Sequence, residues 1–134
     1  MKINDVKEWL QIAEEDIYSA IFLNTSPLKP KEIVCYHCAQ ATEKYLKGFL
    51  AFNDIIPEKT HNLLFLLELC LKINNDFDCI RMECSILNRY NNEIRYPHRI
   101  EITEDDVNYT IKAAVKIKNI DSIIKMVNFI NESK

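Results

Sequence analysis

The chain has 134 residues, of which 48% are hydrophobic and 28% are charged, and its formal net charge is −3. This composition is typical of a soluble globular protein, and the length suits a single domain over residues 1–134. No apolar run approaches the roughly 18–20 residues that span a bilayer, and the first residues lack the apolar core of a secretion signal. We therefore expect a cytoplasmic protein that makes no contact with a membrane.

The cysteine and glycine contents narrow the fold class. Five cysteines form no regular framework, so we expect free thiols in a reducing compartment. One glycine and four prolines leave few positions for tight turns, which argues against an all-β chain with many hairpins. Helices are the expected elements.

The first half of the chain predicts two long helices. Apolar residues recur at helical spacing over residues 4–23, and a loop with two prolines follows over residues 24–30. The second helix ends near Phe52 and contains Gly48, which costs up to ~1 kcal/mol relative to Ala inside a helix. We expect Gly48 to permit the close approach of a neighbouring helix.

The middle of the chain predicts a short helix and a longer one. Thr60 is a reasonable N-cap for a buried helix that runs to about Lys72, and residues 74–76 supply the next polar cap. The apolar stripe of the following helix extends to Ile94, and Pro97 ends it.

The last predicted helix begins at Thr103, where Thr103 and Asp106 resemble a capping box. Its apolar stripe keeps helical spacing from Val107 to Ile130, which predicts one helix of over twenty residues that projects beyond the bundle or packs on a partner. The predicted fold is all-α, a single-domain antiparallel up-and-down bundle of four longer helices plus one short helix.

All four arginines of the chain fall between residues 81 and 99. Against Glu83 and Glu93 they give this stretch a net charge of +2 (four minus two), so the rest of the chain has −5. The planar guanidinium makes forked contacts to phosphate and stacks on flat rings. The stretch is therefore the first candidate for an anion site.

Two interpretations of this stretch remain open. A row at helical spacing would form a polar groove for phosphates and bases, and the row consists of Arg81, Ser85, Asn88, Asn92 and Arg95, with Arg89 beside it. The alternative is a solvated helix face on which Arg89 pairs with Glu93. His98 is a candidate acid or base for RNA cleavage with Arg95 as phosphate clamp, or else an exposed loop residue.

Other motifs predict neither a metal nor a cofactor. The segment Cys35-Tyr36-His37-Cys38 could bring two thiols to one ion, but no second pair has structural-zinc spacing. A single glycine excludes a glycine-rich phosphate loop. We expect His61 to contribute packing or a capping hydrogen bond at the start of the short helix.

The segment Tyr36-His37-Cys38-Ala39-Gln40-Ala41-Thr42-Glu43-Lys44-Tyr45-Leu46-Lys47 resembles the signature of HEPN domains (higher eukaryotes and prokaryotes nucleotide-binding). Thr60-His61-Asn62-Leu63 and Arg95-Tyr96-Pro97 resemble two further motifs of the family in the same order. The resemblance covers almost the whole chain and is closest to stand-alone prokaryotic members. It implies a helical bundle, a homodimer, and a minimal nucleotidyltransferase as partner in a toxin–antitoxin-like module.

Some HEPN proteins are metal-independent ribonucleases with an Arg and a His at a short spacing near the end of the penultimate long helix. Here Arg89 and His98 are separated by eight residues and Arg95 and His98 by two, which departs from that pattern. The favoured hypothesis is a nucleotide- or RNA-binding protein whose binding residues are Arg89, Asn92, Arg95, Tyr96 and His98. The alternatives are a ribonuclease toxin that uses Arg95 and His98 as catalytic residues, and a non-catalytic interaction module.

Overall fold

The computed structural model describes residues 1–92 and 101–133, and it is helical throughout its regular elements. The elements are α1 (Ile3–Thr25), α2 (Lys31–Phe52), α3 (Leu63–Leu71), the 3₁₀ helix η1 (Asn75–Ile80), α4 (Arg81–Asn92), α5 (Glu104–Lys118) and α6 (Asp121–Glu132). No helix of the described residues is long and apolar enough to cross a membrane. The all-α bundle predicted from the sequence is confirmed.

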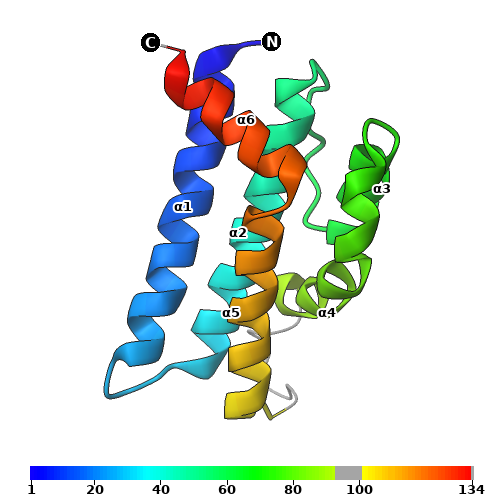
Figure 1. The fold of residues 1–134 in the computed structure, drawn as a ribbon. Helices are drawn as coiled ribbons and strands as arrows, with labels where there is room; N and C mark the ends of the chain where they lie inside the picture. The colour runs from blue at the N-terminus through cyan, green and yellow to red at the C-terminus, as the bar shows by residue number, and fades with distance from the viewer. Residues whose placement is uncertain (93–100, 134) are drawn as a thin grey trace.

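Helix α2 is the centre of the bundle. It packs against α1, α3, α4, α5 and α6, while α1, α2 and α5 lie side by side along much of their length (Figure 1). Because neighbours surround it, α2 buries polar residues as well as apolar ones, including Gln40, Glu43 and Lys47. The sequence pattern placed these three side chains between the apolar positions of the helix, and their burial is decided by the tertiary arrangement.

Gly48 permits close packing of α1 on α2, as predicted. A Cβ atom at Gly48 would lie 3.2 Å from Cβ of Trp9 and 3.5 Å from Cδ2 of Leu10. Carbon atoms prefer a separation of roughly 3.5–4.0 Å, so a Cβ atom at Gly48 would require Trp9 to shift by a few tenths of an ångström. The glycine therefore determines how near Trp9 lies to α2.

The helix ends correct one predicted cap and confirm another. Asn62, rather than Thr60, caps α3, because its Oδ1 accepts hydrogen bonds from the backbone N–H groups of Leu64 and Phe65. The capping box at Thr103 and Asp106 is present at the start of α5. Each cap satisfies backbone donors that have no partner within the helix.

The prediction of a single long C-terminal helix is wrong, because the helix is interrupted between α5, which ends at Lys118, and α6, which begins at Asp121. The side chain of Asn119 donates to the carbonyl of Val115 and ends α5, while the backbone N–H of Ser122 donates to Asp76 of η1 at 2.7 Å. The bond to Asp76 replaces the one that the N–H of Ser122 would make to the carbonyl of Lys118 in a continuous helix. Helix α6 consequently turns across the end of the bundle, where it packs on α1 and α2 (Figure 1).

The five cysteines divide into two groups. Cys35, Cys38, Cys70 and Cys84 are buried, whereas Cys79 is exposed, and all five are free thiols. Burial raises the pKa of Cys38 and of Cys84 to about 12, and it also raises the pKa of Cys35 and Cys70. The thiolate form is therefore suppressed at the buried positions.

Candidate functional site

Most of the residues predicted to bind a nucleotide lie outside the described residues. Arg95, Tyr96 and His98 belong to that segment, as does the side chain of Asn92, the last residue of α4. Arg89 is described, and it is exposed in the last turn of α4. The described part of the site therefore consists of the residues that surround the end of α4.

Two members of the predicted polar row already have partners in the protein. Nη1 of Arg81 lies 2.6 Å from Oε1 of Glu68, and its Nε lies 3.4 Å from Oδ1 of Asp78. Oδ1 of Asn88 accepts a hydrogen bond of 2.8 Å from the backbone N–H of Leu63, at the start of α3. In the N-terminal half of the row, the side chains of Arg81 and Asn88 therefore join α4 to η1 and α3.

Glu43 of α2 is the centre of a polar cluster beside the end of α4. Its carboxylate is fully buried, and Oε1 accepts hydrogen bonds from Nδ1 of His61 at 2.9 Å and from Nδ2 of Asn91 at 3.2 Å. Oε2 pairs with Nζ of Lys44 at 2.9 Å and with Nζ of Lys47 at 3.1 Å. Both oxygens of this buried carboxylate are thus fully engaged.

The surroundings keep Glu43 ionised. Burial alone would raise the pKa of its carboxyl, but hydrogen bonds from Lys44 and His61 and the charges of Lys44 and Lys47 outweigh it, so the pKa is lowered below its ordinary value of 4.5. A buried charge is tolerated when it is paired and hydrogen-bonded in this way. One carboxylate between two ammonium groups leaves a local charge of +1, with His61 taken as neutral.

Asn91 connects this cluster to α4. Its Oδ1 accepts a 3.0 Å hydrogen bond from Nε2 of Gln40, and its Nδ2 donates to the backbone carbonyl of His61 at 2.9 Å. Lys44 completes the network by donating to Oε1 of Gln40 at 3.0 Å. We call this set the Glu43 cluster, and it consists of Gln40, Glu43, Lys44, Lys47, His61 and Asn91.

His61 is the member of the cluster that faces outward. Its side chain is 62% exposed, although its Nδ1 is held by the buried carboxylate of Glu43. Because that carboxylate is an acceptor, Nδ1 is the donor, and Nε2 is left available to a ligand. The expected capping role belongs instead to Asn62, and the hydrogen bond of His61 goes to α2.

The signature segment on α2 therefore reaches two sides of the bundle. Nδ1 of His37 lies 2.9 Å from Oδ1 of Asp16, which ties α2 to α1. Glu43 and its partners tie α2 to the start of α3 and to the end of α4.

Among the described residues, no group of three or more His, Cys, Asp or Glu side chains is arranged to hold a metal ion.

The Glu43 cluster was not predicted from the sequence, because polar residues between the apolar positions of a helix are expected to be exposed to solvent. The available signal was the signature itself, in which Gln40, Glu43, Lys44 and Lys47 recur at spacings of three and four residues on one helix. The sequence predicted Asn92 as a binding residue. The preceding residue, Asn91, is the one that hydrogen-bonds to Gln40 and Glu43.

The family assignment follows from the match to a family model. The model of the HEPN domain matches residues 6–124, a span that contains the whole Glu43 cluster. The chain belongs to the HEPN domain family. No curated protein matches its sequence.

Two solved structures share the HEPN fold of this chain. A crystal structure of ST0689, an archaeal HEPN homologue, is 24% identical, with a TM-score of 0.66 over 93% of this chain and 97% of that one. The crystal structure of TT1696 from Thermus thermophilus is 23% identical, with a TM-score of 0.62 over 98% of this chain and 99% of that one. At these identities the likeness concerns the fold.

Proposed function

We propose that this HEPN protein binds the phosphates of a nucleotide or an RNA at the end of α4. The observation that supports this function is the Glu43 cluster, which fixes Asn91 of α4 at a position between Arg89 and Arg95 in the sequence. A fixed helix end reduces the conformational freedom that a binding segment loses when a ligand is bound. The local charge of +1 and the arginines have the sign that phosphates require.

The residues have separate roles in this proposal. Arg89, Arg95 and His98 contact phosphate oxygens, while Asn92 and Tyr96 contact the base or ribose. Nε2 of His61 offers a further hydrogen bond at the same end of the bundle. Glu43 does not touch the ligand, because its oxygens are already occupied, and it acts by positioning His61 and Asn91.

A salt-dependent binding experiment tests the proposal. Fluorescence anisotropy of a labelled single-stranded RNA should show binding that weakens as salt increases, since each phosphate contact releases counterions. Arg95→Ala should weaken binding about 5- to 20-fold, as expected for loss of one charge-assisted contact. Arg81→Ala is the matched control, because the guanidinium of Arg81 is already paired with Glu68 and Asp78. Equal affinity of the Arg95→Ala variant and the parent would overturn the assignment.

An RNA-cleavage assay separates the binder from the ribonuclease. Incubation of the same RNA between about pH 5 and pH 9 covers the range over which a histidine changes its charge. We expect intact RNA. Cleavage that disappears in His98→Ala would replace the binding function with the ribonuclease alternative.

We further propose that the protein acts as a homodimer beside a minimal nucleotidyltransferase, in a toxin–antitoxin-like module. Membership of the HEPN family supports this context. Light scattering of the purified protein tests the dimer, and co-purification with the product of the adjacent reading frame tests the partner. A monomer at working concentration, or a neighbouring product that does not co-purify, would remove the corresponding part of the proposal.

A further inference from the structure

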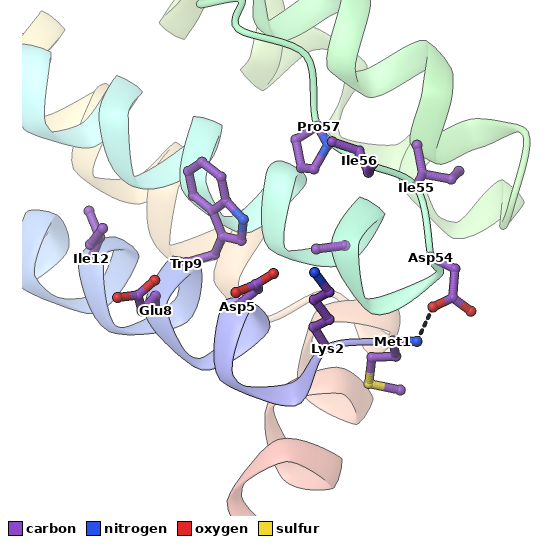
Figure 2. Close-up of a pocket in the computed structure, with 11 residues that line it drawn as sticks. Met1, Lys2, Asp5, Glu8, Trp9, Ile12, Asp54, Ile55, Ile56 and Pro57 are labelled. Carbon is purple, nitrogen blue, oxygen red and sulfur yellow. Dashed lines mark ion pairs between the residues drawn. The ribbon is translucent and has the colours of Figure 1, made fainter.

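A cavity of about 640 Å³ opens between the start of α1, the end of α2 and the chain that follows α2 (Figure 2). Small-molecule sites usually have volumes of roughly 300–1,000 Å³. Its apolar wall consists of Trp9, Ile12, Ala51, Ile55, Ile56 and Pro57. The cavity is thus large enough for a small organic molecule and is separate from the site proposed at the end of α4.

The charged lining of the cavity is acidic. Asp5, Glu8 and Asp54 contribute three carboxylates, against the ammonium of Lys2 and the amino group of Met1, so the net charge of the lining is −1 (two minus three). Asp54 pairs with the amino group of Met1 (Figure 2). Asp5 and Glu8 make no ion pair with any other side chain in the part of the chain that the structure describes. Two carboxylates beside an apolar wall are therefore open to a cation.

The third carboxylate, that of Asp54, belongs to a residue at a backbone position that favours glycine. A Schellman motif closes α2, in which the N–H of Ile55 donates to the carbonyl of Leu50 at 2.9 Å and the N–H of Asp54 donates to Ala51 at 3.1 Å. Asp54 occupies the left-handed position of the motif, with φ of 63°. Its carboxylate consequently lies across the cavity from Asp5 and Glu8 (Figure 2).

Trp9 lies at one end of the cavity, where it contacts Gly48 and Lys47 of α2. Its Cβ packs close to Gly48, and its ring lies 5.5 Å below Nζ of Lys47. A fixed aromatic surface binds a flat or apolar group without a large loss of side-chain freedom.

We propose that this cavity binds a small organic cation, an amine on an aromatic or aliphatic skeleton. The apolar group would lie against Trp9 and Ile55, and the ammonium would pair with Asp5 and Glu8. An anion is disfavoured by the net charge of −1 and by the two carboxylates of Asp5 and Glu8, which are unpaired within the described residues. A neutral apolar ligand would make no use of the two exposed carboxylates. The proposal does not depend on the anion site at the end of α4, whose ligand has the opposite charge.

Intrinsic fluorescence tests the proposal directly, because Trp9 is the single tryptophan of the chain. Phenethylammonium should change the emission saturably, and increasing salt should weaken its binding. Its matched analogue 3-phenylpropionate, with a carboxylate in place of the ammonium, should bind at least about 10-fold more weakly, since like charges oppose each other in the cavity. No saturable change with phenethylammonium, or equal binding of the two probes, would overturn the proposal.

Three variants locate the binding. Asp5→Asn and Glu8→Gln should each weaken phenethylammonium about 3- to 10-fold, as expected for one partly screened charge contact. Asp54→Gly removes the third carboxylate at a position where glycine is favoured, so the variant should weaken binding without loss of fold. Glu15→Gln, an exposed α1 substitution outside the cavity lining, is the control. Unchanged affinity in all three cavity variants, with the fold verified by circular dichroism, would also refute the site.

Discussion

Helix α2 contacts its neighbours in two different ways on its two sides. Towards α1 it presents Gly48, and the contact with Trp9 and Leu10 is made by close packing. Towards α3 and α4 it presents Glu43, and the contact with His61 and Asn91 is made by a buried carboxylate. A contact made by packing loses stability gradually as the shape of a side chain is changed. A buried charge is stable only while each of its hydrogen-bond and ion-pair partners is present. The polar contact is the one that adjoins the proposed phosphate site.

The largest expected effect comes from removing the charge on the polar side. Glu43→Gln keeps the shape of the side chain but leaves Lys44 and Lys47 without their carboxylate, so the free energy of unfolding should fall by about 3–5 kcal/mol. Urea unfolding at neutral pH measures this change. Glu15→Gln, an exposed position on α1, should have an effect close to zero. Similar unfolding midpoints for the two variants would show that the Glu43 cluster is not a stabilising unit.

The same carboxylate predicts how stability depends on pH. The pKa of Glu43 is lower in the folded protein than its ordinary value of 4.5, so its contribution to stability is present above that value and is lost as the pH falls through the folded pKa. The stability difference between the parent and Glu43→Gln should therefore shrink on acidification. Urea unfolding repeated at pH values from neutral to below the ordinary pKa measures this, and a constant difference would contradict an ionised Glu43.

The packing side should respond in a graded way. Gly48→Val inserts bulk against Cβ of Trp9, and overpacking of this kind typically lowers the free energy of unfolding by about 1–3 kcal/mol. Gly48→Ala should cost less, because the gain of up to ~1 kcal/mol in helix propensity opposes the strain. The two variants are compared by thermal unfolding. A valine variant as stable as the alanine variant would show that α1 moves away freely.

The last prediction tests the link between the Glu43 cluster and the proposed RNA-binding residues at the end of α4. Asn91→Ala removes the amide that joins α4 to Gln40 and Glu43, and loss of such hydrogen bonds costs about 1–2 kcal/mol. If Asn91 positions the proposed binding residues at the end of α4, the affinity for RNA should fall as well, as measured by fluorescence anisotropy. Asn74→Ala, which removes the cap of η1, is a control that should reduce stability alone. Equal RNA affinity of Asn91→Ala and the parent would separate the cluster from binding.

Local sequence signals predicted the elements that depend on local interactions. Helical spacing located α1 and α2, the turn chemistry of Asn74 and Thr103 located two helix starts, and the lone glycine indicated a close helix contact. The break at Asn119 was not predictable in this way, because the apolar stripe keeps its register across it and the stabilising contact comes from Asp76. That contact joins residues far apart in the sequence.

The candidate site was predictable only in part for the same reason. The concentration of arginines and the family signature pointed to the end of α4 and to α2, respectively. The burial of Glu43 and its hydrogen bond from His61 depend on how α2, α3 and α4 are placed in space. The cavity beside Trp9 has no sequence signal, because its lining comes from the start of α1 and the end of α2.

The distribution of the cysteines has a practical consequence for following this protein in solution. Four thiols are buried, and at Cys38 and Cys84 the pKa of about 12 suppresses the reactive thiolate. A maleimide dye added near neutral pH should therefore label exposed Cys79 selectively, with no cysteine substitution. The carbonyl of Cys79 accepts a 2.8 Å hydrogen bond from Nζ of Lys116. A dye at this position would report on the contact between η1 and α5 while RNA or amines are added elsewhere.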